Sequence, residues 1–430
     1  MSRILIIGAT GLIGTRIAAE LAVLGHQVVG AARDVGASAR RLPGLEWIRL
    51  DLASSRAEDW SRHLAGVDAV VNCAGGLQSG PTDRLADTHS QGPQALFAAC
   101  HASGVRRIVH FSAIGVDRAT PTEFSRTKLA GDTALMASNL DWVILRPSVV
   151  LGAPAYGASA LIRGLAALPV LPVMPDTAPI QPVTLDDVAA TAIFFIDPAS
   201  PSRLVLELVG PEAMSFPDVI RQYRRWLGFR PAFEFRLPAW LAAGLYRLGD
   251  FTARLGWRPA VRSTARSEIA RGAVGDPSDW QRLTGIAPKS LSAALMARPA
   301  SVQEGWFARL YLLKPVVLGS LVLFWMGSSL ASLGPGYGAG LGLLADRLSS
   351  STAALVVIGG GIADLLIGVG IAIRRTTRAA LIAGIVVSAL YALAGTIVTP
   401  WLWLDPLAPL LKIGPVIALL LVGLATLKDR

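Results

Sequence analysis

Four long apolar segments in the last third of the chain constrain its fold more than any other feature. They lie near residues 312–333, 352–373, 379–398 and 407–427. Each approaches the ~20 residues that a helix needs to cross a hydrocarbon core about 30 Å thick. We therefore predict that residues 306–430 form an all-α bundle of four transmembrane helices.

Charge is sparse and mostly basic, which points to lipid rather than to nucleic acid. Charged residues make up 16% of the 430 residues, below the usual ~25%, and the formal net charge is +10. The arginines flank the apolar spans or are scattered, and no basic stripe is interleaved with aromatic residues. We expect contact with membrane lipid headgroups and no nucleic-acid partner. Cys73 and Cys100, the only cysteines, lack metal-ligand spacing, so no metal site is predicted.

The loops between the spans predict the orientation in the membrane. Arg374, Arg375 and Arg378 separate the second and third spans, whereas the loop after the third span holds tryptophans but no Lys or Arg. The positive-inside rule places the arginine loop in the cytoplasm. The apolar run before Gly8 is too short for a signal peptide. We therefore expect an integral membrane protein with a cytoplasmic N-terminal domain.

Before the spans, short apolar runs alternate with helical segments. The predicted strands cover 3–7, 26–32, 47–50, 69–73, 107–112 and 142–145, and helices are predicted at 12–25 and 91–103. This alternation indicates an α/β Rossmann fold with a doubly wound parallel sheet, to which we assign residues 1–210. Asp186 and Asp187 are placed to cap a helix that starts near Val188.

Residues 211–305 are predicted to form a helical segment on the substrate side. Within it, the stretch 238–257 is amphipathic, because five large apolar residues share one side: Leu241, Leu245, Leu248, Phe251 and Leu255. This helix either packs on the N-terminal domain or lies in the membrane interface.

A glycine-rich turn separates the first strand from the first helix. Its first glycine allows a tight turn, its second lets the backbone approach a pyrophosphate, and its third allows close packing of helix on strand. The phosphates then meet free N–H groups at a helix N-terminus. The turn therefore predicts a dinucleotide site formed by Gly8, Thr10, Gly11, Leu12, Ile13 and Gly14.

The residues after the second and third strands bear on the choice of nucleotide. Arg33 can pair with the 2′-phosphate of NADP, whereas an acidic residue, such as the adjacent Asp34, would bind the ribose hydroxyl of NAD. We favour NADP over NAD as the cofactor. Asp51 is placed to meet the adenine, or else it serves only as a loop or capping residue.

These motifs resemble the short-chain dehydrogenase/reductase superfamily in its atypical branch, near NmrA-like proteins and the 39-kDa accessory subunit of respiratory complex I. The resemblance covers about the first 300 residues and rests also on Asp51-Leu52, Asn72-Cys73-Ala74-Gly75, Ser112, Lys128, Arg146-Pro147-Ser148 and residues 182–189. It implies that Leu52, Cys73, Ala74, Gly75, Pro147 and Ser148 also bind the cofactor. Residues 301–430, including Trp401-Leu402-Trp403-Leu404-Asp405-Pro406-Leu407 and Leu410-Leu411-Lys412, are similar to DoxX-like membrane modules. The combination resembles bacterial fusion proteins described as oxidoreductases with a DoxX-like tail, which implies the bacterial inner (plasma) membrane.

In this superfamily a Tyr donates the proton, and a Lys four residues later holds the nicotinamide ribose. Here these positions are Phe124 and Lys128, and Phe has no proton to give. Lys128 is the only lysine among the first 288 residues, which indicates that an ammonium group is needed there. We prefer a cofactor-binding role for Lys128 over a catalytic one. Ser112 is the candidate for the superfamily's catalytic Ser, although Ala113 and Ile114 follow it at the positions where that Ser is often found.

Asp364 lies near the middle of the second apolar span, where a carboxylate needs a partner or a proton. Lys412 is the best candidate partner, although the expected depths leave direct pairing open. A structural ion pair, a protonated carboxyl, a site for a quinone headgroup and a proton path are the alternatives.

Two functions follow from these observations. The first is a membrane-anchored NAD(P)H-dependent oxidoreductase that acts on a lipophilic carbonyl compound or a quinone. The second is a catalytically inactive NADP(H)-binding redox sensor, or a scaffold with a membrane-protein partner. Phe124 favours the second function, and the prevalence of enzymes in the superfamily favours the first.

Overall fold

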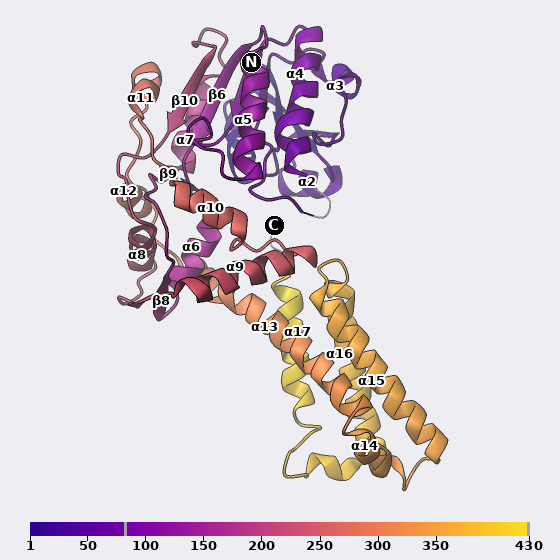
Figure 1. Cartoon of the computed structure of the whole chain (residues 1–430). Helices are drawn as coiled ribbons and strands as arrows, with labels where there is room; N and C mark the ends of the chain where they lie inside the picture. The colour runs from indigo at the N-terminus through magenta and orange to yellow at the C-terminus, as the bar shows by residue number, and fades with distance from the viewer. Residues whose placement is uncertain (81–83, 428–430) are drawn as a thin grey trace. The chain divides into compact units, whose positions relative to one another are not determined.

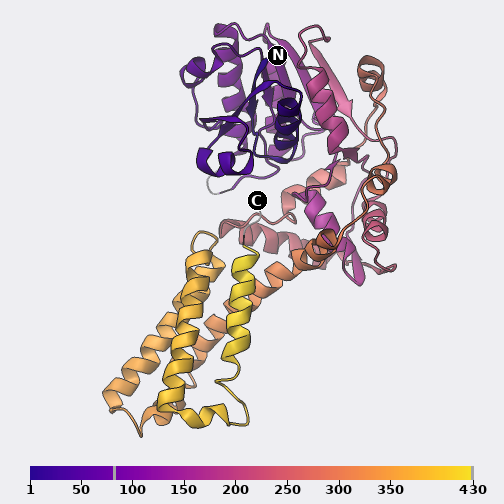
Figure 2. The same cartoon turned by 180° about the vertical axis from the view of Figure 1, so that it is seen from behind.

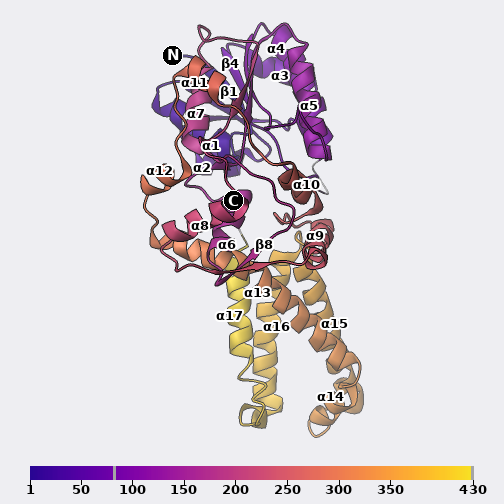
Figure 3. The same ribbon diagram turned by 60° about the vertical axis from the view of Figure 1, so that its left-hand side comes forward.

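The structure is a computed structural model that describes residues 1–80 and 84–427. It divides into two compact units, which we call unit 1 (Met1–Asp250 and Pro259–Ala308) and unit 2 (Phe251–Arg258 and Arg309–Arg430). Figures 1, 2 and 3 show the chain from three sides. The finer predicted division at residue 210 stays a prediction.

Unit 1 is built on a parallel sheet of seven strands in the order β10-β6-β5-β4-β1-β2-β3. The strands are β1 (Arg3–Ile7), β2 (Gln27–Ala32), β3 (Glu46–Arg49), β4 (Ala69–Asn72), β5 (Arg107–Phe111), β6 (Asp141–Pro147) and β10 (Leu204–Leu208). The predicted doubly wound sheet is confirmed, with its six predicted strands placed to within two residues. The strand β10 was not predicted.

Helices cover both faces of this sheet (Figure 1). The helices of unit 1 are α1 (Leu12–Val23), α2 (Val35–Arg41), α3 (Ala57–Leu64), η1 (Asp87–Gln91), α4 (Gly92–Ala102), α5 (Glu123–Met136), α6 (Ala158–Ala166), α7 (Leu185–Phe194), α8 (Phe216–Trp226), α9 (Ala239–Arg254, which ends in unit 2), α10 (Ser263–Arg271), α11 (Ser278–Thr284) and α12 (Leu291–Met296). Two small parallel pairs complete the unit: β7 (Val150–Leu151) with β9 (Val183–Thr184), and β8 (Val170–Val173) with β11 (Phe233–Arg236).

The alternation of side chains along β1 explains the two layers of helices. Ile4 and Ile6 pack into one core with α1, α7 and α11, whereas Leu5 and Ile7 pack into a second core with α3, α4 and α5. A strand buried on both faces must be apolar at every position, and this is why β1 reads as a continuous apolar run.

The start of α7 differs from the prediction. The helix begins at Leu185, and the side chain of Thr184 caps it by accepting a hydrogen bond from the backbone N–H of Asp187. Asp186 and Asp187 therefore lie in the first turn, where a carboxylate still interacts favourably with the helix dipole. The prediction that they cap a helix near Val188 was wrong by one turn.

Unit 2 is helical. Its elements are α13 (Val302–Leu333, which begins in unit 1), α14 (Tyr337–Leu344), α15 (Ser350–Ala372), α16 (Thr377–Val398), η2 (Pro400–Trp403) and α17 (Ile413–Ala425). Three helices, α13, α15 and α16, are long and apolar enough to cross a membrane. Large apolar side chains such as Leu330, Leu355 and Ile397 are exposed on them, as expected for helices that face lipid.

Two predicted spans differ from the structure. The helix α13 starts ten residues before the expected span at 312–333. The fourth span was predicted over 407–427, but α17 has only 13 residues, roughly 20 Å at 1.5 Å per residue. Pro406 and Pro409 lack the N–H that a helix interior needs, and Ala408 has a left-handed φ of 44°, so no continuous helix runs through residues 406–409. A fourth helix of full spanning length is thus absent from the described part of unit 2.

Candidate nucleotide-binding site

The site is organised by the turn between β1 and α1, next to the point where the strand order reverses between β1 and β4. Gly8 has a φ of 75°, and a Cβ added there would lie 2.8 Å from the backbone N of Ala74. A Cβ on Gly14 would lie 2.3 Å from the carbonyl oxygen of Gly8. Both positions therefore require glycine, and the turn is drawn tight against α1 and β4.

The N-terminus of α1 is left open by this turn. Gly11 is the N-cap, and no side chain caps the first turn of the helix. Its backbone N–H donates to Gly8 at 2.9 Å, so the next amides, on Leu12 and Ile13, begin the helix. These amides have no side-chain cap, and the glycines of the turn have no Cβ to block the approach of a ligand. Such a helix N-terminus suits the pyrophosphate of a dinucleotide. Thr10 is exposed at the same turn.

The two residues after β2 have different roles. The Asp34 carboxylate accepts a hydrogen bond from the N–H of Ala37 at 2.9 Å and caps α2. Arg33, beside it, is exposed. After β3, Asp51 accepts from the N–H of Ala53 at 3.2 Å, which is the loop role that the sequence left open. Leu52 is buried next to it.

The loop after β4 is held by a buried side chain that the sequence analysis did not assign. The amide oxygen of Asn72 accepts from the N–H of Ala74 at 3.1 Å, and its nitrogen lies 3.1 Å from Nδ1 of His110. The N–H of Cys73 donates to the carbonyl of Ile7 at 2.9 Å. This loop, which includes Gly75, is thereby fixed beside the glycine turn.

Lys128 lies in α5, and its side chain is buried. Its ammonium donates to the carbonyl of Phe111, at the end of β5, over 2.7 Å. It lies close to Gly75, where an added Cβ would be 3.1 Å from Nζ. Burial lowers the pKa of Lys128 to about 8, against the opposing effects of Asp132 and Cys73. The structure thus brings Lys128 to the same edge of the sheet as Gly75, and the predicted contact with the ribose remains a prediction.

His89, which the sequence analysis missed, lies between this loop and α5. Its Nε2 accepts a hydrogen bond from the N–H of Gly76 at 3.2 Å, which assigns the ring proton to Nδ1. Nδ1 then donates to the hydroxyl oxygen of Thr127 at 3.0 Å. Burial, assisted by Lys128, lowers the pKa of His89 to about 2, so the ring is neutral. The ring of Phe124 meets it edge-on, with 5.6 Å between centroids.

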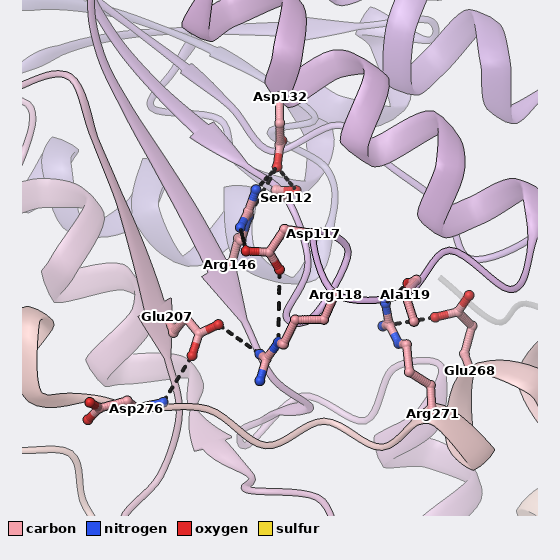
Figure 4. A network of polar contacts seen from close by, with 10 residues as sticks. All are labelled: Ser112, Asp117, Arg118, Ala119, Asp132, Arg146, Glu207, Glu268, Arg271 and Asp276. Carbon is pink, nitrogen blue, oxygen red and sulfur yellow. Dashed lines mark hydrogen bonds and ion pairs between the residues drawn. The ribbon is translucent and has the colours of Figure 1, made fainter.

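Ser112 is part of a buried network of polar side chains, drawn in Figure 4. Its hydroxyl donates to Asp132 at 2.8 Å, and Asp132 also accepts from Nη2 of Arg146 at 3.0 Å. Burial raises the pKa of Asp132, while Ser112 and Arg146 oppose that shift. Arg146 in turn pairs with Asp117. The Ser112 hydroxyl is thus engaged by Asp132, and its predicted catalytic role stays a prediction.

The network reaches the segments that follow the sheet. Arg118 pairs with Glu207 of β10 at 2.7 Å, and Arg271 of α10 pairs with Glu268 at 2.9 Å (Figure 4). The Glu268 carboxylate also accepts from Ser125 at 2.9 Å, in the first turn of α5. Helix α10 is therefore attached to the helix that carries Phe124 and Lys128. No local sequence pattern indicated this contact, because more than 140 residues separate Glu268 from Ser125.

The last two predicted cofactor-binding residues end β6 and follow it. The carbonyl of Pro147 accepts from the N–H of Ile114 at 3.1 Å. The hydroxyl of Ser148 donates to the carbonyl of Ala273 at 2.8 Å. Pro147 thus contacts the loop after β5, and Ser148 joins the sheet to the segment after α10. Over the part of the chain that the structure describes, no group of three or more His, Cys, Asp or Glu residues is placed to hold a metal ion.

A second polar cluster lies inside unit 2. The carboxylate of Asp364 accepts from the hydroxyl of Ser328 at 2.7 Å and from that of Tyr391 at 2.9 Å. These groups border a cavity of about 230 Å³ that is otherwise lined by glycine, serine and valine. Both Asp364 and Lys412 are described, and they form no ion pair, so Lys412 was the wrong partner.

Known proteins share both units of this chain. Residues 8–169 match the NAD(P)H-binding family, and residues 322–421 match the DoxX-like family. The chain is 24% identical over 311 residues to a ceramide reductase of Caulobacter vibrioides, which covers 67% of this chain and 97% of the relative. It is also 24% identical to the NADH dehydrogenase [ubiquinone] 1 alpha subcomplex subunit 9 of Arabidopsis thaliana, over 52% of this chain and 59% of that protein.

The fold of unit 1 is also found in solved structures. A UDP-glucuronic acid 4-epimerase of Bacillus cereus, in complex with UDP-glucuronic acid and NAD, superposes with a TM-score of 0.53. It is 20% identical and covers 72% of this chain and 100% of its own. The matched families thus agree with the glycine turn, which predicted a dinucleotide cofactor, and with the apolar helices, which predicted a membrane module. The chain joins a Rossmann-type NAD(P)H-binding domain to a DoxX-like domain.

Proposed function

We propose that the protein is a membrane-anchored oxidoreductase that uses NADPH to reduce a lipophilic carbonyl compound or a quinone. The observation that carries this proposal is the tight glycine turn, which leaves the N-terminus of α1 without a side-chain cap. The nucleotide-binding unit faces the cytoplasm of a bacterial cell, and the helices of unit 2 lie in its inner membrane. Arg374 and Arg375, between α15 and α16, and Arg378, in the first turn of α16, support this orientation.

The residues of the site would share the work of holding the nucleotide. The turn from Gly8 to Gly14 binds the pyrophosphate, and Lys128 binds the nicotinamide ribose. Arg33 supports NADPH over NADH, because the neighbouring Asp34 is engaged in capping α2 and a guanidinium can pair with the 2′-phosphate. When it is bound, NADPH supplies a hydride. A quinone that accepts this hydride takes its proton from water and becomes a quinol, so no tyrosine is needed.

The lipophilic substrate is supported by two observations. The chain carries helices long and apolar enough to cross a membrane, so its nucleotide domain is held near lipid. A relative that it matches over two thirds of its length is named for ceramide, which is a lipid. A protein anchored in this way meets lipid-soluble substrates at a high local concentration.

A second function is favoured by Phe124. This residue replaces the proton-donating Tyr of the superfamily, and its ring packs against the neutral His89. A protein without a proton donor could bind NADP(H) as a redox sensor, or as a scaffold with a membrane-protein partner. The similarity to a subunit of NADH dehydrogenase supports this alternative.

One experiment separates the two functions. The purified full-length protein in detergent is mixed with NADPH, and the absorbance of the reduced cofactor is followed with a short-chain quinone or with a lipophilic ketone. Gly11→Val places a branched side chain where the backbone should approach the pyrophosphate. Gly44→Ala is the matched control, because nothing lies within 4 Å of a Cβ at Gly44.

Turnover in the parent and in Gly44→Ala, but not in Gly11→Val, is the result expected of the enzyme. Tight binding of NADPH without oxidation by either acceptor would instead establish the sensor or scaffold. If the parent binds neither NADPH nor NADH, both functions are wrong.

A further inference from the structure

Helix α9 turns its large apolar side chains away from the protein. Trp240 is 75% exposed, Leu248 57% and Phe251 55%, and Leu241 and Leu245 are exposed beside them. We call these five residues the α9 stripe. Such an exposed apolar patch on one helix marks a site of interaction, because monomeric soluble proteins rarely expose large contiguous apolar patches.

The opposite side of the helix makes the contacts with protein. Ala242 and Tyr246 are buried in a small cluster that includes Leu237. A Cβ on Gly249 would lie 1.8 Å from the carbonyl oxygen of Val261, so the backbone of α9 touches its neighbour there. The helix therefore packs on its neighbours through Ala242, Tyr246 and Gly249, and its leucine side is left exposed.

The C-terminal end of α9 is attached to a membrane-crossing helix. Residues Phe251–Arg258 belong to unit 2. The indole N–H of Trp257 donates to the carbonyl of Ala372, the last residue of α15, at 2.7 Å. The guanidinium of Arg374 lies 5.4 Å from the centroid of the Trp257 ring, and its backbone N–H donates to Leu255 at 3.0 Å. Trp257 is the third residue after Arg254, roughly 10 Å along the chain at most.

Charge around α9 matches an anionic lipid surface. Arg247 and Arg254 are exposed on the helix and lie off the stripe, and Arg258 is exposed just after it. Arg375 and Arg378 are exposed in the segment that follows α15. Basic residues beside an apolar stripe bind anionic headgroups while the stripe enters the acyl region.

We propose that α9 lies along the membrane interface, with the α9 stripe in the lipid and its arginines among the headgroups. The occupant is lipid rather than a second protein surface, because the helix ends beside the end of a membrane-crossing helix. Trp240 adds to the argument, since tryptophan favours the boundary between headgroups and acyl chains. This inference does not depend on the proposed enzymatic activity.

Spin labels on the full-length protein test the proposal. Single cysteines replace Leu245 or Leu248 in the stripe, Arg247 off the stripe, and Val23 at the exposed end of α1, which is 87% exposed. The parent protein, subjected to the same labelling, measures any background from Cys73 and Cys100. Each variant is placed in nanodiscs of phosphatidylethanolamine and phosphatidylglycerol, after its thermal unfolding has been matched to the parent. Accessibility is then measured to molecular oxygen and to a water-soluble nickel chelate.

The expected result is that labels at residues 245 and 248 are several-fold more accessible to oxygen than to the chelate, relative to the Val23 position. The label at residue 247 should remain accessible to the chelate. Stripe labels that meet the chelate as freely as the Val23 label would overturn the proposal in favour of solvent. Immobile labels shielded from both reagents would overturn it in favour of a protein partner or a second copy of the chain.

Discussion

The ammonium of Lys128 donates a hydrogen bond to the carbonyl of Phe111, 2.7 Å away at the carboxyl end of β5. An ammonium has three donors, so this bond leaves two for a ligand. The side chain is buried, and its stem runs from α5 toward the end of the sheet beside Gly75. Lys128 therefore has a fixed position and two N–H donors that remain available for a ligand, and a ribose-binding residue requires both.

Replacement of Lys128 should weaken nucleotide binding. A hydrogen bond to a charged group contributes about 1.5–3 kcal/mol, so Lys128→Met should lower the affinity for NADPH about 10- to 100-fold. Lys128→Arg should also weaken binding, because the larger guanidinium would have to fit beside Gly75, where even an added Cβ would lie only 3.1 Å from Nζ of Lys128. Isothermal titration of the purified protein measures both changes. Lys289→Met, at an exposed lysine, is the control. Unchanged affinity in Lys128→Met would remove the residue from the site.

The pKa of Lys128, which burial lowers to about 8, predicts two opposite pH dependences. The unfolded chain keeps the ordinary pKa of 10.5, so between about pH 8 and 10.5 it binds more protons than the folded chain. Folding stability should therefore rise with pH across this window, by an amount on the order of 3 kcal/mol at most. The affinity for NADPH should fall over the same rise in pH, because the ammonium loses its charge.

Thermal unfolding without nucleotide, compared between the parent and Lys128→Met, isolates the first effect. The difference in melting temperature should shift in favour of the parent from pH 8 to pH 10. Parallel pH profiles for the two proteins would show that the Lys128 ammonium is not perturbed by burial.

Substitutions of Arg33 and Asp34 should have different effects, the first on the preference between NADPH and NADH and the second on folding stability. Arg33→Ala should lower the affinity for NADPH about tenfold or more while affecting NADH little, because only NADPH carries the 2′-phosphate. Asp34→Ala removes the cap of α2 and should cost about 1 kcal/mol of stability without changing the ratio of the two affinities. Titrations with both nucleotides give the ratio. A preference for NADH that survives in Arg33→Ala and is lost in Asp34→Ala would reverse the assignment.

Phe124→Tyr should create the proton donor that the superfamily uses. The new hydroxyl would stand four residues before Lys128, and positioned proton transfer contributes about 10²- to 10⁴-fold to a rate. We expect the variant to gain NADPH-dependent reduction of a lipophilic ketone relative to the parent. Phe124→Leu, which removes the ring contact with His89 without adding a hydroxyl, should gain nothing. Equal rates in the parent and Phe124→Tyr would mean that this position does not face the substrate.

The sequence predicted those parts of the fold that depend on local patterns. The turn from Gly8 to Gly14 was recognisable because each glycine has a separate steric reason, and buried parallel strands such as β1 are continuous apolar runs. Strand β10 was missed because its apolar run is only five residues long and is interrupted by Glu207. The fourth membrane span was overestimated because hydropathy counts apolar residues but not the prolines that prevent a helix from forming.

The candidate site divides in the same way. Lys128 stood out because lysine is rare in this chain. Its buried ammonium at the end of β5 is consistent with the predicted cofactor-binding role. His89, Asn72 and Glu268 could not be found from the sequence, because their partners lie on elements that only the folded sheet brings together. The helix α9 shows the same limit: its pattern located the apolar side, but only the packing of Ala242 and Tyr246 shows which side faces protein.

Asp364 offers a test of how the membrane helices are held together. Its carboxylate accepts hydrogen bonds from Ser328 and Tyr391, on α13 and α16. Asp364→Ala leaves both hydroxyls without this partner and should lower the stability of the bundle by about 1–3 kcal/mol. Tyr391→Phe removes one bond and should cost about 0.6 kcal/mol, the average measured between membrane helices.

Lys412→Met should have a smaller effect than either, since Lys412 does not pair with Asp364. Thermal unfolding of the full-length protein in detergent gives the order. Destabilisation by Lys412→Met that equals that of Asp364→Ala would restore the ion pair expected from the sequence.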